Sequence, residues 1–315
     1  MTRGSTLRGS LVAAALIFAG TATADETPAA TAPAAGGAAA AVPAAAAPVV
    51  GMPPGADDVL RVCADPNNMP LSDNKGEGYE NKIAELLAHD LGKKLEYMWF
   101  PQRMGFIRNT LRARDPNEDH YKCDLVMGVP VGYELTLTTP AYYRSTWAMV
   151  FPKGKGLDGI HTPDDLLKID PDKLKKLRFG LVGRSPPTDW LLKHNLIDQA
   201  VPYPTQSGDP EAYPGEMIDK ELAAGHIDIA FAWGPIAGYF SSHAAPPGML
   251  MVPFPVDPDI QFDYKIAMGV RFGEKAWRDK VTSLIEHDRK QIEGILLSYG
   301  VPLLDDQGKL IQASN

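Results

Sequence analysis

The first candidate ligand-binding residues of the chain are Asp65 and Asn67. They follow the apolar segment Leu60–Ala64, in a loop rich in Pro and Asn. A helix is expected at Asn81–Leu91 and a second strand at Leu95–Phe100. Strand, helix and strand within about forty residues make a βαβ unit, so the sheet should be parallel. Ligands of open parallel sheets lie beyond the carboxyl ends of the strands, so we expect this loop to bind a small molecule.

A second group of candidates is aromatic. The rings offer a large surface to a flat molecule or to a hydrophobic segment of a protein partner. For Trp99 and Phe100, which end a strand, packing in the core is an equal alternative to exposure in a ligand cleft. Trp233 precedes Gly234-Pro235, and we expect its ring to face the cleft. The aromatic candidates are Tyr79, Trp99, Phe100, Tyr133, Tyr142, Tyr143 and Trp233.

Three arginines complete the candidate site. Arg103 and Arg108 are five residues apart near an expected helix start, so they do not share one face of a helix. For one of the two, pairing with a local carboxylate is the alternative to ligand binding. Arg144 lies where the chain is expected to leave its first lobe. It either stabilises that crossing or is a plain surface charge.

The patterns of known catalytic and metal sites are missing. The seven histidines show no His-x-x-x-His or His-x-His spacing, which leaves a zinc site without support. Ser185 lacks the second Gly of a nucleophile elbow, and the segment 257–268 lacks the Gly and Glu of a calcium loop. A cleft carboxylate would serve a dehydratase, but no paired-carboxylate spacing supports one at Asp65, Glu77 or Glu80. The sequence therefore predicts a protein that is not an enzyme.

The elements that follow predict two lobes. The strand Tyr142–Phe151 leaves the first lobe and the strand Lys265–Val270 returns to it, so two crossings join a hinged pair with a cleft between them. Further strands are expected at 178–183 and 227–233, and helices at Asp164, at Pro187 with Thr188 or Asp189 near its cap, at 216–224 and at 275–299. We assign residues 58–147 and 266–300 to lobe 1, residues 148–265 to lobe 2, and residues 301–315 to a C-terminal tail.

The N-terminus has the pattern of an export signal. Arg3 and Arg8 precede an apolar run that ends in Ala22-Thr-Ala24. We assign residues 1–24 to a signal peptide and 25–57 to an Ala/Pro-rich tether, and we expect the cleaved chain in the periplasm without membrane insertion. Without the two arginines the chain has 29 basic and 39 acidic residues, a net charge of −10. This charge argues against nucleic acid and favours a basic protein partner.

Cys63 and Cys123 are the two cysteines of the chain. In an exported protein an even pair invites a disulfide. Cys63 lies in the first strand, and Cys123 opens the apolar run 123–129, so the geometry suits a pair if these strands are neighbours. The disulfide would close a loop of about sixty residues, and the chain-entropy model predicts that it raises the free energy of unfolding by about 4 kcal/mol. We expect a structural role, because the chain has no Cys-x-x-Cys pair.

Five segments carry a family pattern: Leu60–Asn68, Gly76–Leu86, Pro101–Leu111, Cys123–Pro130 and Tyr142–Thr146. The chain resembles the type II periplasmic solute-binding fold, an α/β fold. Within it, the chain resembles the quinoprotein-dehydrogenase-associated proteins of the XoxJ/MxaJ type, which accompany PQQ-dependent methanol dehydrogenases. The segments 63–68 and 101–106 are more similar to XoxJ, of the lanthanide-dependent system, than to MxaJ, of the calcium-dependent system.

The resemblance also implies what the cleft does not bind. Amino-acid-binding relatives hold the ligand carboxylate with an Arg and its amine with an Asp. Alignment of Tyr142-Tyr143 puts Gly132 or Tyr133 at the Arg position, and alignment of the 227–233 strand puts Trp233 at the Asp position. An Arg fork is the natural partner of a carboxylate, and nothing nearby replaces it. We therefore expect a ligand other than an α-amino acid.

Two functions follow from the resemblance. The first is a non-catalytic accessory protein that binds or activates the apo-dehydrogenase through its cleft, with a c-type cytochrome as a further partner. The alternative is the solute-binding subunit of an ABC importer for a small molecule such as PQQ or a metal chelate. PQQ carries three carboxylates, so convergence of Arg103, Arg108 and Arg144 would favour import. A wide aromatic cleft would favour the accessory role.

Overall fold

The computed structural model describes residues 56–204, 209 and 211–311. The expected signal peptide at residues 1–24 and nearly all of the expected tether at 25–57 lie outside this part of the chain. Among the helices that are described, none has the length and apolar character needed to cross a membrane.

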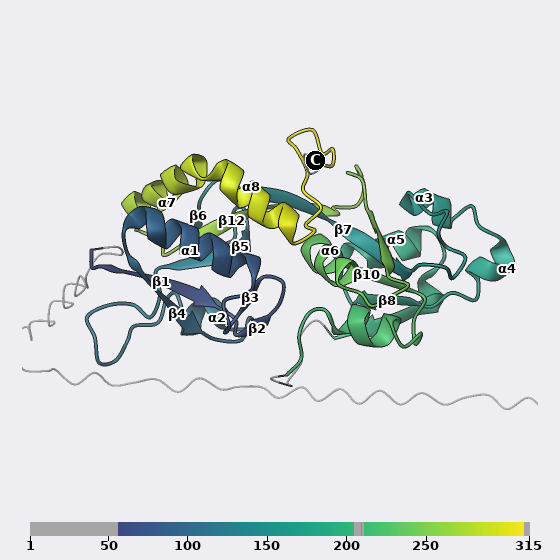
Figure 1. The fold of residues 1–315 in the computed structure, drawn as a ribbon, viewed down its shortest axis with the longest axis horizontal. Coiled ribbons are helices and arrows are strands. Elements are labelled where there is room, and N and C mark those ends of the chain that lie inside the picture. Colours follow the sequence, from purple (N-terminus) through teal and green to yellow (C-terminus); the bar gives the residue numbers. More distant parts are fainter. Residues whose placement is uncertain (1–55, 205–208, 210, 312–315) are drawn as a thin grey trace, which may run out of the picture. The chain divides into compact units, whose positions relative to one another are not determined.

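The fold is built on one mixed sheet. Its strands follow the order β4-β1-β5-β12-β7-β10-β8-β9, with β11 also paired to β7 and β6 to β12 (Figure 1). The neighbours β4, β1 and β5 are parallel, as are β10, β8 and β9, whereas β12 and β7 are antiparallel to each other and to the strands beside them. Two parallel units therefore flank a central antiparallel pair. The strands are β1 (Val59–Ala64), β4 (Lys94–Trp99), β5 (Leu125–Pro130), β6 (Leu137–Thr138), β7 (Tyr143–Pro152), β8 (Phe179–Val182), β9 (Ala200–Tyr203), β10 (Ile229–Trp233), β11 (Met249–Pro253) and β12 (Asp263–Val270), with a separate hairpin of β2 (Asn67–Asn68) and β3 (Ser72–Asp73).

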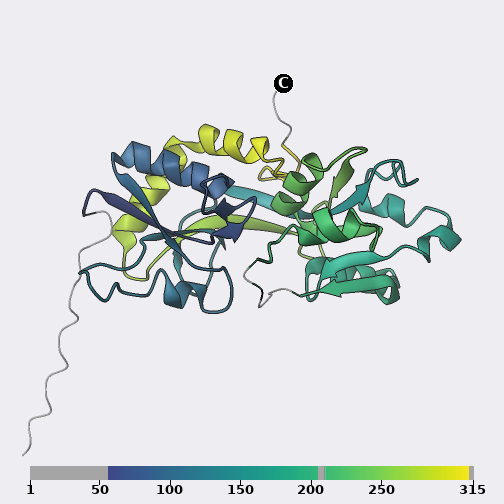
Figure 2. The ribbon, with the colours of Figure 1, turned by 60° about the horizontal axis from the view of Figure 1, so that its bottom comes forward.

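Helices pack on both units. Figures 1 and 2 show α1 beside α7 and α8, and the buried side chains of these three helices pack with those of β1, β5 and β12. The helices are α1 (Tyr79–Leu91), α2 (Phe106–Asn109), α3 (Pro163–Leu166), α4 (Pro171–Leu174), α5 (Pro186–Lys193), the 3-10 turn η1 (Ile197–Gln199), the π-helix η2 (Met217–Leu222), α6 (Gly234–Ser242), α7 (Lys275–His287) and α8 (Arg289–Ser298).

The hydrophobic core divides into two lobes along β7. Residues Tyr143–Thr146 pair with β12, and the next residues, Trp147–Val150, pair with β10. Leu60 and Met268 belong to the core of the first lobe, while Phe231 belongs to that of the second. The expected lobe boundaries at residues 147/148 and 265/266 stay a prediction.

Helix α1 begins one half-turn before the expected start. The side-chain oxygen of Asn81 accepts the backbone N–H of Gly78, the residue before the helix, at 3.1 Å, and that of Asp73 in β3 at 3.0 Å. A Cβ on Gly78 would lie 2.2 Å from the carbonyl oxygen of Leu71, so this turn requires glycine. The helix ends at Gly92, which has the left-handed φ of 65° typical of a helix C-terminus.

Three expected helices differ from the prediction. The expected helix at 275–299 is two helices, which meet at the buried Asp288. The segment expected as an α-helix at 216–224 forms η2, a π-helix. Helix α5 begins at Pro186, because the fixed φ of proline suits the first helical turn. Ser185 is therefore the residue before the helix, and neither Thr188 nor Asp189 caps it.

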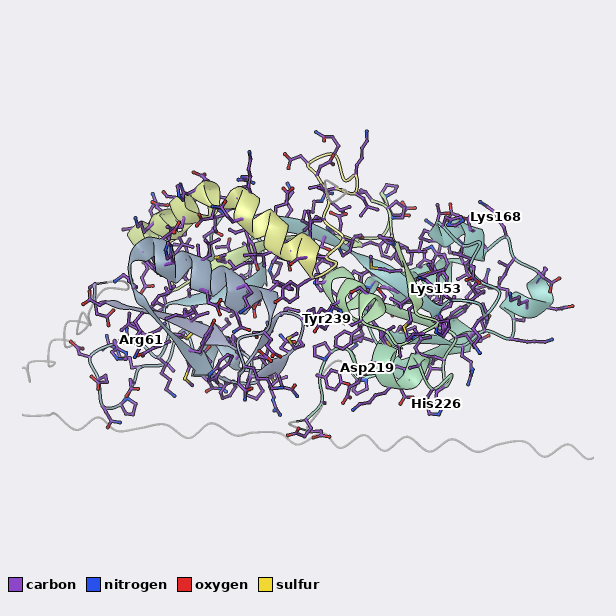
Figure 3. All side chains as sticks on the ribbon, viewed as in Figure 1. Arg61, Lys153, Lys168, Asp219, His226 and Tyr239 are labelled. Atoms are coloured by element: carbon purple, nitrogen blue, oxygen red, sulfur yellow. A yellow bond between two sulfur atoms is a disulfide. The ribbon has the colours of Figure 1, made fainter. Side chains whose placement is uncertain are left out.

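The expected C-terminal tail is partly core. Val301, Leu303 and Leu304 are buried, and the Ser145 hydroxyl donates to the carbonyl of Pro302 at 2.9 Å. Tyr239 of α6, labelled in Figure 3, stacks on Tyr299 with ring centroids 6.0 Å apart. Residues after α8 therefore contact both β7 and α6.

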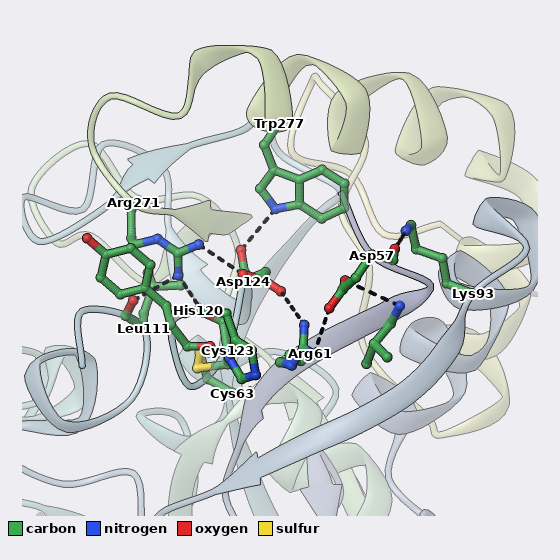
Figure 4. A network of polar contacts seen from close by, with 12 residues as sticks. Asp57, Arg61, Cys63, Lys93, Leu111, His120, Cys123, Asp124, Arg271 and Trp277 are labelled. Atoms are coloured by element: carbon green, nitrogen blue, oxygen red, sulfur yellow. Dashed lines mark hydrogen bonds and ion pairs between the residues drawn. A yellow bond between two sulfur atoms is a disulfide. The ribbon is translucent and has the colours of Figure 1, made fainter. Parts of the chain in front are cut away.

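Cys63 and Cys123 form the expected disulfide, which joins β1 to the residues before β5. Beside it, Arg271 donates to Asp124 at 2.9 Å and to the carbonyl of Leu111 at 3.0 Å, and it also bonds the carbonyl of Cys123 (Figure 4). Burial, its largest influence, raises the pKa of Asp124, while Arg271 and Arg61 oppose that shift. This end of the first lobe is thus held by a covalent bond and a buried ion pair.

Candidate binding cleft

A cavity of about 430 Å³ lies where the carboxyl ends of β1, β4, β8, β9 and β10 meet. This is the position at which parallel α/β sheets bind ligands. The first lobe contributes two loops, and the second contributes strand ends and the segment before η2. The described lining residues are Asp65, Pro66, Asn67, Asn68, Pro101, Gln102, Arg103, Trp147, Val182, Tyr203, Pro204, Asp209, Ala212, Tyr213, Pro214, Glu216, Met217, Ala232, Trp233 and Ile236.

Asp65 lies in the cleft wall, but both oxygens of its carboxylate accept hydrogen bonds from backbone N–H groups. One oxygen accepts the backbone N–H of Asn67 at 2.9 Å, and the other accepts the backbone N–H of Gln102. The Gln102 side chain in turn accepts from the Asn68 amide at 2.8 Å. Asp65 therefore joins the two loops of the first lobe and fixes the shape of their wall.

Asn67 links the two walls of the cleft. Its side-chain amide donates to the backbone carbonyl of Glu211 at 3.2 Å. Glu211 belongs to the segment that precedes η2 and lines the opposite side. The contact is exposed, so water can replace it when the cleft widens.

Four aromatic rings line the cavity. Trp147 and Trp233 are opposite each other on β7 and β10, with ring centroids 6.4 Å apart in an edge-on arrangement. Tyr213 stacks on Phe240 and donates its hydroxyl to Asp219 at 2.6 Å. The hydroxyl of Tyr203 donates to Glu221 at 3.2 Å, and burial followed by the Glu221 charge raises the pKa of Tyr203 to about 12. With both phenol hydrogens used inside the protein, Tyr203 and Tyr213 offer their ring surfaces to the cleft.

The three candidate arginines do not converge. Arg103 lines the cavity, while Arg108 is exposed on α2. Arg144 binds Asp263 at 2.7 Å and donates to the carbonyl of Asp305 at 3.3 Å, so it stabilises the crossing of β7 and β12. Among the described lining residues, Arg103 is the single cation beside the acidic side chains Asp65, Asp209 and Glu216.

The tyrosines expected in the cleft lie in the core. Tyr79 is fully buried, and its hydroxyl lies 3.1 Å from that of Tyr143. Tyr142 and Tyr143 are 7% exposed and pack in the same core cluster. They border a separate cavity of about 450 Å³, together with Arg144. Tyr79 starts the buried face of α1, which is why it points away from the ligand loop.

Trp99, Phe100 and Tyr133 lie outside the described lining of the cleft. Trp99 stacks on Tyr97 with ring centroids 4.5 Å apart. This agrees with the alternative that the Trp99 ring packs against the protein and does not line the ligand cleft. Phe100 and Tyr133 pack against the cluster around the disulfide. Of the predicted site residues, the structure brings together Asp65, Asn67, Arg103 and Trp233.

Sequence reasoning missed three of the four cleft rings. Trp147 lies in the strand that was recognised, but its position opposite Trp233 depends on strand pairing that the sequence does not show. Tyr203 ends a strand interrupted by Pro202, and Tyr213 lies in an irregular segment rich in Gly and Pro, so neither carries a periodic pattern.

Glu80 is the most perturbed carboxyl of the first lobe. It is buried under the ligand loop at the start of α1, and its Oε1 has no hydrogen-bond partner among the described residues. Burial, and to a smaller degree the charge of Asp65, raises its pKa to about 8. Because Glu80 does not line the cavity, it is not placed to transfer protons to a ligand there.

Comparison with known proteins identifies the family. No model of a known protein family matches the chain. The crystal structure of the periplasmic binding protein XoxJ from Methylobacterium extorquens AM1 is 33% identical, with a TM-score of 0.62 over 78% of this chain and 100% of that one. The chain belongs to the XoxJ/MxaJ family of periplasmic binding proteins.

Further relatives agree with this family. The protein MoxJ of Paracoccus denitrificans is 28% identical over 258 residues, which cover 78% of this chain and 89% of MoxJ. MxaJ from Methylophaga aminisulfidivorans MPT is 25% identical, with a TM-score of 0.63 over 78% of this chain and 100% of that one. An arginine-bound binding protein of an amino acid ABC transporter from Streptococcus pneumoniae, at 18% identity and a TM-score of 0.52, shares the fold. The expected type II periplasmic binding fold is thereby confirmed.

Proposed function

We propose that this chain is a non-catalytic accessory protein of a PQQ-dependent methanol dehydrogenase. It acts in the periplasm, where it binds or activates the apo-dehydrogenase by holding an apolar segment of that enzyme in its cleft. The family supports this partner, because the chain resembles the XoxJ/MxaJ-type proteins that accompany PQQ-dependent methanol dehydrogenases. The identity to XoxJ, 33% against 25% to MxaJ, favours the lanthanide-dependent system.

The observation that carries the proposal is the lining of the cleft. Trp147, Trp233, Tyr203 and Tyr213 present rings, and the carboxylate of Asp65 is already satisfied by backbone N–H groups. Aromatic rings at the centre of an interface, surrounded by polar groups, are typical of protein contacts that carry binding energy. An apolar helix or strand of a partner matches such a surface better than a small polar solute does.

The same lining argues against import of PQQ. Its three carboxylates require several cations, and Arg103 is the single cation among the described lining residues. Arg108 and Arg144 are both elsewhere, and Arg144 is paired with Asp263. A polyanion would also meet the acidic side chains of Asp209 and Glu216, of which Glu216 is paired with Lys220.

These acidic side chains define the charge of the partner. Acidic side chains outnumber basic ones among the described lining residues, so a bound segment flanked by Lys or Arg would be attracted to the cleft, while Glu216 is itself paired with Lys220 at 2.8 Å. Such attraction acts mainly on the association rate and weakens with salt. A basic c-type cytochrome would be attracted by the same charge, and competition between cytochrome and apo-dehydrogenase distinguishes a shared surface from two separate ones.

The proposal is tested by calorimetric titration of the protein with metal-free, PQQ-free dehydrogenase. We expect saturable binding, a loss of about tenfold or more in affinity for Trp233→Ala and for Tyr213→Ala, and no change for Trp99→Ala. Trp99→Ala is the matched control, because it removes a half-buried ring that stacks on Tyr97 outside the cleft. Thermal unfolding of each variant shows that the fold is intact.

Two results would overturn the proposal. One is the absence of both binding to the apo-dehydrogenase and activation of it when lanthanide and PQQ are supplied. The other is saturable heat with PQQ alone at micromolar affinity, which would indicate a solute carrier.

A further inference from the structure

A second cluster of polar side chains lies on the first lobe, away from the cleft. Asp90 is in the last turn of α1, and His287 and Asp288 are at the junction of α7 and α8. The ligand atoms of these three side chains all lie within 4.8 Å of one another. None of the three lines the cavity described above. The packing of α1 against α7 and α8 brings them together (Figure 2).

Asp288 has an unusual environment. It is 0% exposed, and neither of its carboxylate oxygens has a hydrogen-bond partner among the described residues. An Asp that precedes a helix normally accepts backbone N–H groups of the first turn, but the Asp288 side chain makes no such cap on α8. Its carboxylate instead faces that of Asp90. A buried carboxylate beside a second one is costly unless a proton or a metal cation lies between them.

The imidazole of His287 is the third member of the cluster. Its Nε2 lies 3.8 Å from an Asp90 oxygen and 4.0 Å from an Asp288 oxygen, distances that are too long for hydrogen bonds. The Nδ1 of His89 lies 2.8 Å from the other Asp90 oxygen. A carboxylate that binds a metal ion is commonly oriented by such an outer hydrogen bond.

We propose that Asp90, His287 and Asp288 form a binding site for a divalent transition-metal ion of the Zn²⁺ class. One imidazole nitrogen and two carboxylates are ligands that Zn²⁺ accepts, with water in the remaining position. The exposed ring of His287, 72% accessible at its side chain, can rotate to reach metal-bond distance. A divalent cation neutralises the two carboxylates, a role that a proton shared between Asp90 and Asp288 would otherwise take.

The site would tie three helices of the first lobe together. It connects the end of α1 to the break between α7 and α8. The end of α1 and this break are far apart in the sequence. A ligand that binds the folded state alone raises the free energy of unfolding with its concentration. Sequence spacing could not reveal this site, because its residues come from separate helices.

The test is calorimetric titration of the tag-free, chelator-stripped chain with Zn²⁺ alone, together with thermal unfolding at each metal concentration. We expect one saturable site and a midpoint that rises with Zn²⁺. We expect His287→Ala and Asp288→Asn each to weaken the affinity by at least about tenfold. His161→Ala is the matched control, because it removes an exposed imidazole in the other lobe and should leave the affinity unchanged.

His287→Ala keeps the proposal falsifiable even if the buried Asp288→Asn variant fails to fold, since it alters an exposed side chain. The inference is overturned if Zn²⁺ does not saturate a single site, or if His287→Ala binds Zn²⁺ as tightly as the unaltered chain. An equal loss in His161→Ala would also overturn it, because it would indicate adventitious binding to surface histidines.

Discussion

Gly238 of α6 lies against the backbone of Gly300, so closely that a Cβ on Gly238 would stand 1.9 Å from the Gly300 carbonyl oxygen. Gly300 itself has a φ of 74°, in the left-handed region that suits glycine. The neighbouring residues Tyr239 and Tyr299 stack on each other. A helix beside the second-lobe sheet and the chain that leaves α8 thus meet backbone to backbone.

Replacement of Gly238 by Ala should destabilise the protein. The added methyl group meets rigid backbone rather than a flexible side chain, so we expect the free energy of unfolding to fall by about 1–3 kcal/mol. Gly294→Ala is the matched control, because an added Cβ on this exposed position of α8 meets nothing within 4 Å. Helix propensity predicts a gain of about 0.5–1 kcal/mol there. Urea denaturation measures both changes, and equal effects would contradict the close approach.

Removal of Arg271 should be among the most costly substitutions in the first lobe. Arg271→Met leaves Asp124 buried without its main partner, for which we expect a loss of about 3–5 kcal/mol. Lys193→Met is the comparison, since it breaks the exposed pair with Asp259 and should cost less than about 1 kcal/mol. Chemical denaturation of both variants gives the difference, and a similar small loss in both would show that the buried pair contributes little.

The disulfide should account for a separate part of the stability. Replacement of both Cys63 and Cys123 by Ser frees a loop that spans 60 residues, and we expect the free energy of unfolding to fall by about 2–5 kcal/mol. A reducing agent should produce a comparable loss in the unaltered protein and none in the variant. Denaturation curves with and without reductant test this, and an effect of reductant on the double variant would contradict it.

The parallel βαβ unit at the start of the first lobe and the ligand loop could be predicted because they depend on local patterns. Apolar runs separated by an amphipathic helix indicate parallel strands, and the end of such a strand locates Asp65 and Asn67. Trp233 was predicted for the same reason, as the last residue of β10. These residues lie in the cleft because the fold itself puts strand ends there.

The remainder depends on contacts between distant segments, which periodicity does not record. Arg144 could not be assigned without its partner Asp263 on another strand. Tyr79 belongs to the buried face of α1, which became evident only when the helix start was known. The break at Asp288 stayed hidden because Leu284 and Ile292, on either side of it, keep the same amphipathic spacing.

The buried carboxyl of Glu80 should make stability depend on pH. In the unfolded chain its pKa is close to the ordinary value of 4.5, whereas burial raises the folded-state pKa to about 8. Below pH 4.5 the carboxyl is protonated in both states, so it does not lower the free energy of unfolding. Between these two values the unfolded chain loses the proton while the folded protein keeps it, so the free energy of unfolding falls as pH rises. The full penalty, of the order of a few kcal/mol, is reached above pH 8.

Glu80→Gln should remove this dependence, because Gln has the shape of the protonated acid and does not ionise. The stability of Glu80→Gln relative to the unaltered protein should therefore increase steadily from pH 5 to pH 8. Glu77→Gln is the matched control, since Glu77 is exposed three residues away and its replacement should leave the pH profile unchanged. Urea denaturation at several pH values measures the three profiles. Parallel profiles for the unaltered protein and Glu80→Gln would show that Glu80 ionises normally in the folded protein.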